Sequence, residues 1–242
     1  MRTVILGKKI EYFVEGEGRD LLLIHGWVAN KNQWVKWTRL LTKLGYRVWA
    51  IDLPGFGNSD SPENFWGIDE YVETVEEFVK DRRMKNITLL GHSLGSRLAL
   101  VLASRIKDAE KVVVFGIAAS RVSPIFTKIY TSSVKLVPYF LREFVGKKVF
   151  RISWWSHKDW EMGWKLSNQL ERVMSADISR KVKDLRMPIY VGNGLWDYLT
   201  PIFNLGVFSG MKNVTFKVFS KSSHWPDVQE EENFGGWLKE IL

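Results

Sequence analysis

The sequence predicts an α/β protein whose central sheet is mostly parallel and flanked by helices. Short apolar runs of strand length alternate along the chain with longer segments in which apolar residues recur at helical spacing. The runs are continuous, as in residues 112–115, which is typical of strands buried on both faces of a parallel sheet. The 242 residues fit a single domain of this class.

The expected elements follow this alternation up to residue 115 and resume after residue 187. An edge hairpin over residues 3–14 is closed by a glycine turn at 16–18. The apolar runs that end at His25 and Asp52 are candidate parallel strands, with a helix between them. The expected strands lie at 3–6, 10–14, 21–24, 46–51, 87–90, 112–115, 189–191 and 215–219, and the expected helices at 34–44, at 69–82, after Ser93 and at 229–242.

Residues 121–186 differ in composition from the rest of the chain. They hold fourteen Lys and Arg against six Asp and Glu, a net charge of +8, which equals the net charge of the whole chain. Ten aromatic residues occur in the same segment, mostly at spacings typical of amphipathic helices. We therefore expect a helical cap over 121–186, inserted into a core made of residues 1–120 and 187–242.

Composition and motifs exclude several classes of protein. The chain has no Cys, which excludes disulfides, thiolate metal sites and a cysteine nucleophile. Four dispersed histidines and the lack of a dinucleotide or phosphate-loop motif predict neither a metal nor a cofactor. The positive charge is confined to the aromatic cap segment without a nucleic-acid-binding motif, so we expect no nucleic-acid partner. The lack of a signal-peptide or membrane-spanning run predicts a cytoplasmic protein.

The pentapeptide Gly91-His92-Ser93-Leu94-Gly95 carries the strongest chemical signal. It matches G-x-S-x-G and lies where an expected strand ends and a helix begins, which is the context that this nucleophile motif requires. A serine on so tight a turn has strained backbone angles, and the glycines leave room for the neighbouring strand and helix. Unpaired N–H groups at the helix start suit a developing oxyanion. Ser93 is the candidate nucleophile, although a serine that only caps a helix has the same local pattern.

A serine hydroxyl needs a general base, and the chain has four histidines. His92 adjoins Ser93 on a turn that directs its side chain elsewhere. His25 ends a strand beside a candidate oxyanion loop, and His157 lies in the cap segment. His224 follows the last expected strand, at the sheet edge where α/β proteins gather their functional groups. We therefore expect His224 to be the base.

Asp197 is the candidate acid that orients this base. A glycine-rich turn after the strand at 189–191 carries it to the same edge of the sheet. Asp52 also ends an expected strand, but residues 52–57 have a sequence typical of a structural turn. The turn at 116–118, after the preceding strand, has no carboxylate. Asp197 is therefore favoured over Asp52.

With these motifs the chain resembles the α/β-hydrolase superfamily over essentially its full length. The similarity runs from His25-Gly26-Trp27 through the 52–57 turn to the His224 loop, and the order of serine, acid and histidine is the one of that superfamily. The resemblance implies an oxyanion hole formed by the backbone N–H groups of Trp27 and Leu94.

The resemblance also implies a serine carboxylesterase. The branches that act on haloalkanes and epoxides use an aspartate where this chain has Ser93. One departure from the pattern is Gln229, where relatives commonly have glutamate. The expected function is hydrolysis of a carboxylic ester through an acyl-enzyme intermediate, without a cofactor.

The cap segment is the expected site of substrate and partner binding. Phe126, Trp154 and Trp155 are candidates for the lining of a pocket under the cap. The chain is similar to esterases that demethylate pimeloyl methyl ester on acyl carrier protein, which implies an acidic carrier protein as a partner of the basic cap. An anionic lipid surface is an alternative partner, because Lys and Arg interleave with aromatic residues there. A thioesterase, and a non-catalytic binding protein on the same fold, are the alternative functions.

Overall fold

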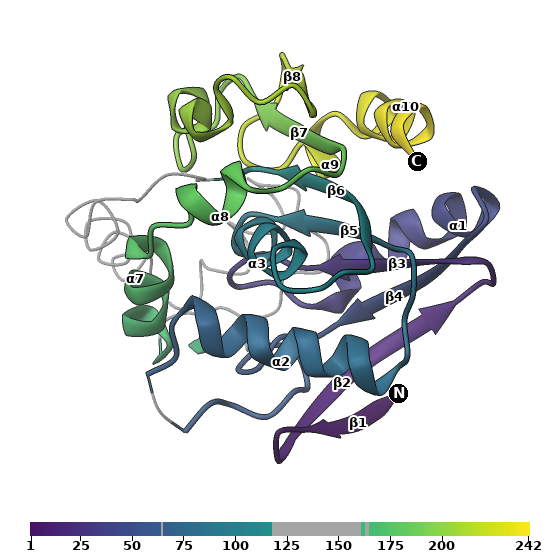
Figure 1. The fold of residues 1–242 in the computed structure, drawn as a ribbon, viewed down its shortest axis with the longest axis vertical. Helices are drawn as coiled ribbons and strands as arrows, with labels where there is room; N and C mark the ends of the chain where they lie inside the picture. Colours follow the sequence, from purple (N-terminus) through teal and green to yellow (C-terminus); the bar gives the residue numbers. More distant parts are fainter. Residues whose placement is uncertain (64, 118–160, 163–164) are drawn as a thin grey trace.

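The structure is a computed structural model, and it describes residues 1–63, 65–117, 161–162 and 165–242. Within these residues the centre of the molecule is an eight-stranded sheet with the order β1-β2-β4-β3-β5-β6-β7-β8 (Figure 1). The strands are β1 (Arg2–Ile5), β2 (Lys8–Glu15), β3 (Arg19–Ile24), β4 (Tyr46–Ile51), β5 (Ile87–His92), β6 (Ala109–Phe115), β7 (Ile189–Gly194) and β8 (Val214–Phe219).

The sheet is parallel over most of its width. β1 and β2 form an antiparallel hairpin at one edge, and β2 also runs antiparallel to β4. The pairs from β4 across to β8 are parallel. This confirms the predicted α/β class and the edge hairpin. Because the central strands are parallel, the loops that follow β3, β5, β6, β7 and β8 meet at one edge of the sheet.

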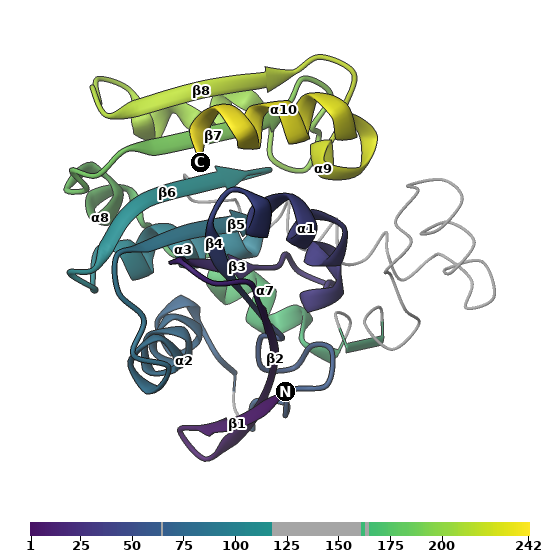
Figure 2. The ribbon, with the colours of Figure 1, turned by 90° about the vertical axis from the view of Figure 1, so that its right-hand side faces the viewer.

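Helices cover both faces of the sheet (Figure 2). On one face α2 (Ile68–Asp81), α3 (Leu94–Ala103) and α8 (Ser179–Lys183) contribute to the larger core cluster. On the other face α1 (Val35–Lys43) and α10 (Glu231–Ile241) pack over the second cluster. The remaining helical segments are η1 (Lys31–Trp34), α7 (Ser167–Ser175), η3 (Ile202–Phe208) and α9 (Pro226–Gln229).

The spacing of apolar residues explains why these helices dock. In α2 the fully buried side chains Tyr71, Val75 and Phe78 recur at i, i+4 and i+7 and so share one face of the helix. α3 differs, because every one of its residues is buried. This helix lies in the interior of the molecule and begins at Leu94, immediately after Ser93.

The predicted strands and the helix at 69–82 are confirmed, with ends shifted by at most three residues. The expected helix at 34–44 corresponds to α1, which follows the 3-10 turn η1, and the expected helix at 229–242 corresponds to α10, which follows α9. Pro226 at the first turn of α9 begins a separate short helix. The 3-10 helix η3 was not predicted, because short turns of this kind have little periodicity.

Only the C-terminal part of the predicted cap, 161–162 and 165–186, belongs to the described residues. Val173, Ile178 and Val182 lie in the larger core cluster. The buried Arg97 guanidinium of α3 donates to the Val173 carbonyl at 3.2 Å, near the C-terminal end of α7 where carbonyl groups lack helical partners. This part of the segment is therefore anchored to α3, and the cap itself stays a prediction.

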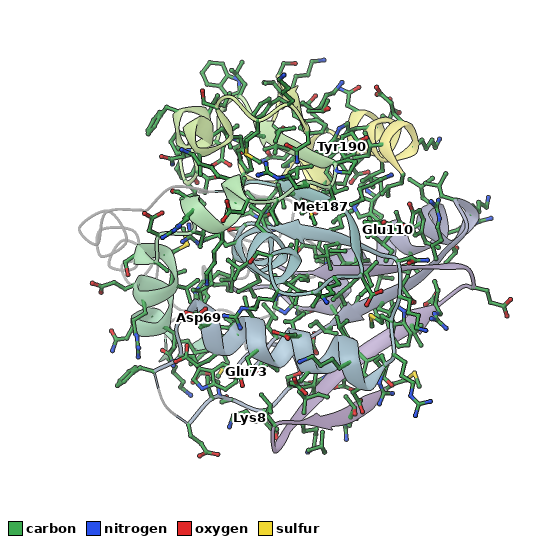
Figure 3. The ribbon with its side chains drawn as sticks, viewed as in Figure 1. Lys8, Asp69, Glu73, Glu110, Met187 and Tyr190 are labelled. Carbon is green, nitrogen blue, oxygen red and sulfur yellow. The ribbon has the colours of Figure 1, made fainter. Side chains whose placement is uncertain are left out.

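Polar contacts fix the same segment from outside. Asp69 lies at the start of α2 (Figure 3). Its carboxylate accepts a hydrogen bond from Lys181 of α8 at 3.2 Å. Arg105, after α3, forms an ion pair with the same carboxylate. In the described part of the chain, no helix is both long and apolar enough to cross a membrane.

Candidate active site

Ser93 lies at the junction of β5 and α3 with a positive φ, at φ 52° and ψ −112°. A positive φ is unusual for a non-glycine residue and stores strain that surrounding contacts must maintain. The flanking glycines make the turn sterically feasible. A Cβ atom on Gly91 would lie 2.4 Å from the Gly95 carbonyl oxygen, and one on Gly95 would lie 2.1 Å from the Ile24 carbonyl oxygen. Larger residues would therefore separate β5, α3 and β3.

Ser96 stabilises this turn through hydrogen bonds to β5 and β6. Its buried hydroxyl lies 2.7 Å from the Gly91 carbonyl oxygen and 2.9 Å from that of Phe115, and it accepts from the Phe115 N–H at 3.2 Å. The Ser93 N–H donates to the Phe115 carbonyl at 3.0 Å. These bonds couple the strained residue to the end of β6. Ser93 itself keeps partial solvent exposure.

The loop after β3 lies next to Ser93. A Cβ atom on Gly26 would be 3.3 Å from the Ser93 Cβ, so the chain approaches closely only because residue 26 is glycine. His25 is fully buried and braces the loop: one ring nitrogen contacts the Gly26 carbonyl at 2.8 Å, and the other accepts the Leu53 N–H at 2.9 Å. Val28 follows with φ 57°, a second strained position beside the site.

The two predicted oxyanion donors belong to these two segments. Leu94 is the first residue of α3, so its N–H has no acceptor within the helix. Trp27 follows Gly26, and its ring packs edge-on against Phe56 with centroids 4.9 Å apart. Both donors therefore belong to chain that borders Ser93, and their role stays a prediction.

His224 and Asp197 form a buried pair. The distance from His224 Nδ1 to Asp197 Oδ2 is 2.9 Å, and the two residues are 4% and 3% exposed. Asp197 follows β7 and His224 follows β8, so adjacent parallel strands bring them together. The ring lies over Gly116, whose missing Cβ would be 3.2 Å from His224 Nδ1. A side chain at residue 116 would displace the imidazole.

Asp197 is held by donors that the sequence did not identify. Its Oδ1 accepts the N–H groups of Leu199 and Thr200 at 2.9 and 2.8 Å, and its Oδ2 accepts the Thr200 hydroxyl at 2.6 Å. Burial alone would raise the pKa of Asp197, but the charge and hydrogen bond of His224 and the bonds from Thr200 lower this pKa to about 2. The carboxylate is therefore ionised whenever the protein is folded near neutral pH.

A second buried polar cluster lies behind His224. His92 Nε2 is 3.0 Å from the His224 carbonyl oxygen, and His92 Nδ1 is 3.0 Å from Gln33 Nε2. Gln33 Nε2 is also 3.2 Å from Asp227 Oδ2. Burial holds the pKa of His92 well below its ordinary value, and burial also raises the pKa of Asp227 to about 6. Sequence reasoning missed Gln33 and Asp227, since neither belongs to a motif.

Asp52 and Gln229 both have structural roles near the site. Asp52 ends β4 and accepts from the Lys31 ammonium at 2.8 Å and from the Asn58 N–H at 2.9 Å, which is the role of a structural turn. Gln229, the departure from the family pattern, accepts the Ser223 N–H at 2.7 Å and so fastens the His224 loop. Among the described residues, no group of three or more acidic or histidine side chains could hold a metal.

Four candidates from the sequence cannot be placed. The described residues do not include Phe126, Trp154, Trp155 and His157.

Comparison with known proteins agrees with this geometry. The sequence pattern of the alpha/beta hydrolase fold family matches residues 21–151. The chain belongs to this family. Over 96% of its length this α/β hydrolase is 23% identical to the AB hydrolase superfamily protein YisY of Bacillus subtilis, covering 95% of that protein. The α/β hydrolase also superposes on the esterase EaEST of Exiguobacterium antarcticum with a TM-score of 0.86 and 19% identity, covering 99% of this chain and 97% of the esterase.

A shorter similarity links this α/β hydrolase to a second relative. Over 85 residues it is 38% identical to the pimeloyl-[acyl-carrier protein] methyl ester esterase of Photobacterium profundum. That stretch spans 35% of this chain and 31% of the relative. This short stretch agrees with membership of the same family.

Proposed function

We propose that the protein is a serine hydrolase that cleaves carboxylic esters through an acyl-enzyme intermediate, a carboxylesterase in the broad sense. The observation that carries this proposal is the conjunction of two features at one sheet edge. One is Ser93 at positive φ on the turn between β5 and α3. The other is the buried His224–Asp197 pair, 2.9 Å apart, on the loops after β8 and β7.

In the first half-reaction Ser93 Oγ attacks the ester carbonyl while His224 Nε2 takes its proton. Asp197 keeps the proton of His224 on Nδ1, which leaves Nε2 free as the base, and it stabilises the imidazolium that forms. The developing oxyanion accepts hydrogen bonds from the backbone N–H groups of Leu94 and Trp27. Each of these hydrogen bonds stabilises the transition state by about 3 kcal/mol. The imidazolium then gives its proton to the leaving alcohol, and the acyl group stays on Ser93.

In the second half-reaction water replaces the alcohol. His224 takes a proton from the water, hydroxide adds to the acyl carbonyl, and Ser93 leaves as its oxygen regains the proton. The products are the carboxylic acid and the free enzyme. Each step uses the same base and the same oxyanion donors.

The name of the Photobacterium relative supports a narrower proposal about the substrate. An acyl group on an acidic carrier protein would bring negative charge toward the segment 121–186, whose net charge is +8. Phe126, Trp154 and Trp155 are proposed to contact the acyl chain. An anionic lipid substrate would use the same charge.

A series of p-nitrophenyl esters of increasing acyl length tests the broad proposal. The parent should hydrolyse at least one ester with a burst of one p-nitrophenol per active site if deacylation is slow, and Ser93→Ala should lose at least a thousandfold in kcat/KM. Ser104→Ala is the matched control, since this exposed serine lies at the other end of α3. A folded parent that hydrolyses no ester would favour a binding protein on the same fold.

Salt dependence tests the carrier proposal. Hydrolysis of a methyl ester on acyl carrier protein should fall at least tenfold in kcat/KM between about 50 and 500 mM salt, because screening removes the charge attraction. Hydrolysis of the free methyl ester should change less than twofold. Equal salt dependence of the two substrates would contradict the carrier proposal, and a preference for anionic vesicles of an ester lipid would favour the lipid surface.

A further inference from the structure

Behind the His224–Asp197 pair, one side-chain amide joins two parts of the site that are far apart in sequence. Gln33 comes from η1 near the N-terminus, whereas Asp227 lies in α9, three residues after His224. Gln33, His92 and Asp227 are 2%, 2% and 1% exposed. Polar side chains buried to this degree carry a desolvation cost, so their retention needs a reason.

The hydrogen-bonding pattern of this cluster has one consistent assignment. The His224 carbonyl can only accept, so His92 Nε2 carries a proton and donates to it. His92 is neutral because burial disfavours its cation, so His92 Nδ1 accepts from Gln33. The two hydrogens of the Gln33 amide nitrogen then go to His92 Nδ1 and Asp227 Oδ2. Each bond fits a neutral His92 and an Asp227 that accepts.

The consequence is that the segment from His224 to Asp227 is held at both ends. His92 holds the His224 backbone through its carbonyl, and Gln33 holds Asp227 through its carboxyl. The His92 and His224 rings are also neighbours, with centroids 4.9 Å apart. These contacts fix the backbone of His224, whereas Asp197 bonds its imidazole ring.

Asp227 also brings charge to the site. Its Oδ1 has no hydrogen-bond partner among the described residues, and burial raises the pKa of its carboxyl to about 6. The charged and titratable groups that act on it are His224 and, from α1, Lys36, and both favour its ionised form. Among the described residues, Asp197 bonds His224 directly, and the charges of His224, Asp197 and His25 act on His92.

We propose that Asp227 is a second positioning acid for His224: through Gln33 and His92 it fixes the His224 backbone, and its carboxylate favours protonation of the imidazole. As a positioning role this rests on the proposed function. It makes the base stronger than Asp197 alone would make it, since a nearby negative charge favours the imidazolium that forms when Ser93 is deprotonated.

Imidazole NMR on the full chain tests the proposal independently of turnover. The chain has four histidines, and loss of one signal in His224→Gln assigns the resonance. In Asp227→Asn, which keeps an oxygen acceptor for Gln33 but removes the charge, the pH midpoint of His224 protonation should fall by about half to one unit. Gln33→Met should shift it in the same direction, because Asp227 then loses the donor that favours its ionised form.

Asp20→Asn is the matched control. Asp20 is also a buried carboxylate, 3% exposed, but it lies at the start of β3, on the edge of the sheet away from the site, and bonds Arg47. This variant should change stability without moving the His224 midpoint. A midpoint in folded Asp227→Asn within about 0.2 unit of the parent would overturn the proposal.

Kinetics separate this proposal from the proposed function. The acid limb of the kcat/KM profile should move to lower pH in Asp227→Asn, with kcat about threefold to tenfold lower at pH 8 and KM within about twofold. Unchanged kcat and an unmoved acid limb would also overturn it. If Ser93→Ala keeps the parent activity, the proposed function fails, while the NMR midpoint still decides the role of Asp227.

Discussion

The loop after β7 and the short helix α9 each place one buried carboxylate near His224, and the two carboxylates differ in their hydrogen bonds. Asp197 accepts from two backbone N–H groups, a hydroxyl and the imidazole, and its pKa is lowered to about 2. Asp227 accepts from Gln33, and burial raises its pKa to about 6. Both are almost fully buried. The charge of His224 and the donors around Asp197 therefore outweigh its burial, whereas burial dominates at Asp227.

The largest expected effect comes from changing the better-bonded acid. Asp197→Asn should lower kcat by about 10⁴-fold, because an amide in this position favours the histidine tautomer with its proton on Nε2, where it cannot act as the base. Steady-state kinetics with a p-nitrophenyl ester measures this loss. A decrease of less than tenfold would mean that Asp197 does not orient the base.

Asp227, which accepts a hydrogen bond from Gln33, should lower the stability of the folded protein when it is ionised. The folded pKa of Asp227, about 6, lies above its ordinary 3.8, so ionisation opposes folding above pH 6 by at most about 3 kcal/mol and has no effect below about pH 4. Asp227→Asn should therefore be more stable than the parent at pH 8 and equally stable at pH 4. Urea unfolding at the two pH values measures the difference. Equal destabilisation at both would contradict it.

Asp197 should have the opposite dependence on pH. Its folded pKa of about 2 lies below the ordinary 3.8, so its contribution of about 2 kcal/mol is fully present above pH 4 and is lost as pH falls toward 2. The difference in unfolding free energy between the parent and Asp197→Asn should shrink over that interval. A difference that stays constant from pH 5 to pH 2 would contradict the assignment.

The smallest effect is expected from one donor to Asp197. Thr200→Val keeps the backbone N–H bond but removes the hydroxyl that lies 2.6 Å from Asp197 Oδ2 and 3.3 Å from His224 Nδ1. We expect kcat to fall about fivefold, equivalent to about 1 kcal/mol, with KM unchanged. Thr200→Ser should restore most of the rate, and failure of this rescue would show that the methyl group matters and the hydroxyl does not.

The two acids also show how far the sequence predicts the site. Asp197 follows a glycine-rich turn at the end of a strand, and this pattern alone placed it at the right edge of the sheet. Asp227 and Gln33 have no such signal, because these two residues are 194 positions apart in the sequence and meet only when the sheet folds. Thr200 had a weak local signal, since an Asp often bonds the N–H groups two and three residues after it.

The fold was predicted more completely than the site. Continuous apolar runs locate parallel strands, and the helical spacing of Tyr71, Val75 and Phe78 locates α2. The strain at Ser93 followed from its motif, whereas the positive φ of Val28 could not be predicted, because β-branched residues rarely adopt this conformation. Local pattern therefore gives elements and motifs, and long-range polar contacts require the structure.

Ser93 is proposed to be the residue that becomes acylated, and covalent labelling with a fluorophosphonate tests this role. The serine oxygen attacks phosphorus and fluoride leaves, which gives a stable adduct that intact mass and peptide mapping detect. We expect one adduct per chain on the peptide that contains Ser93, none in Ser93→Ala and a labelling rate at least a thousandfold lower in His224→Ala. Labelling of Ser93→Ala at the parent rate would contradict it.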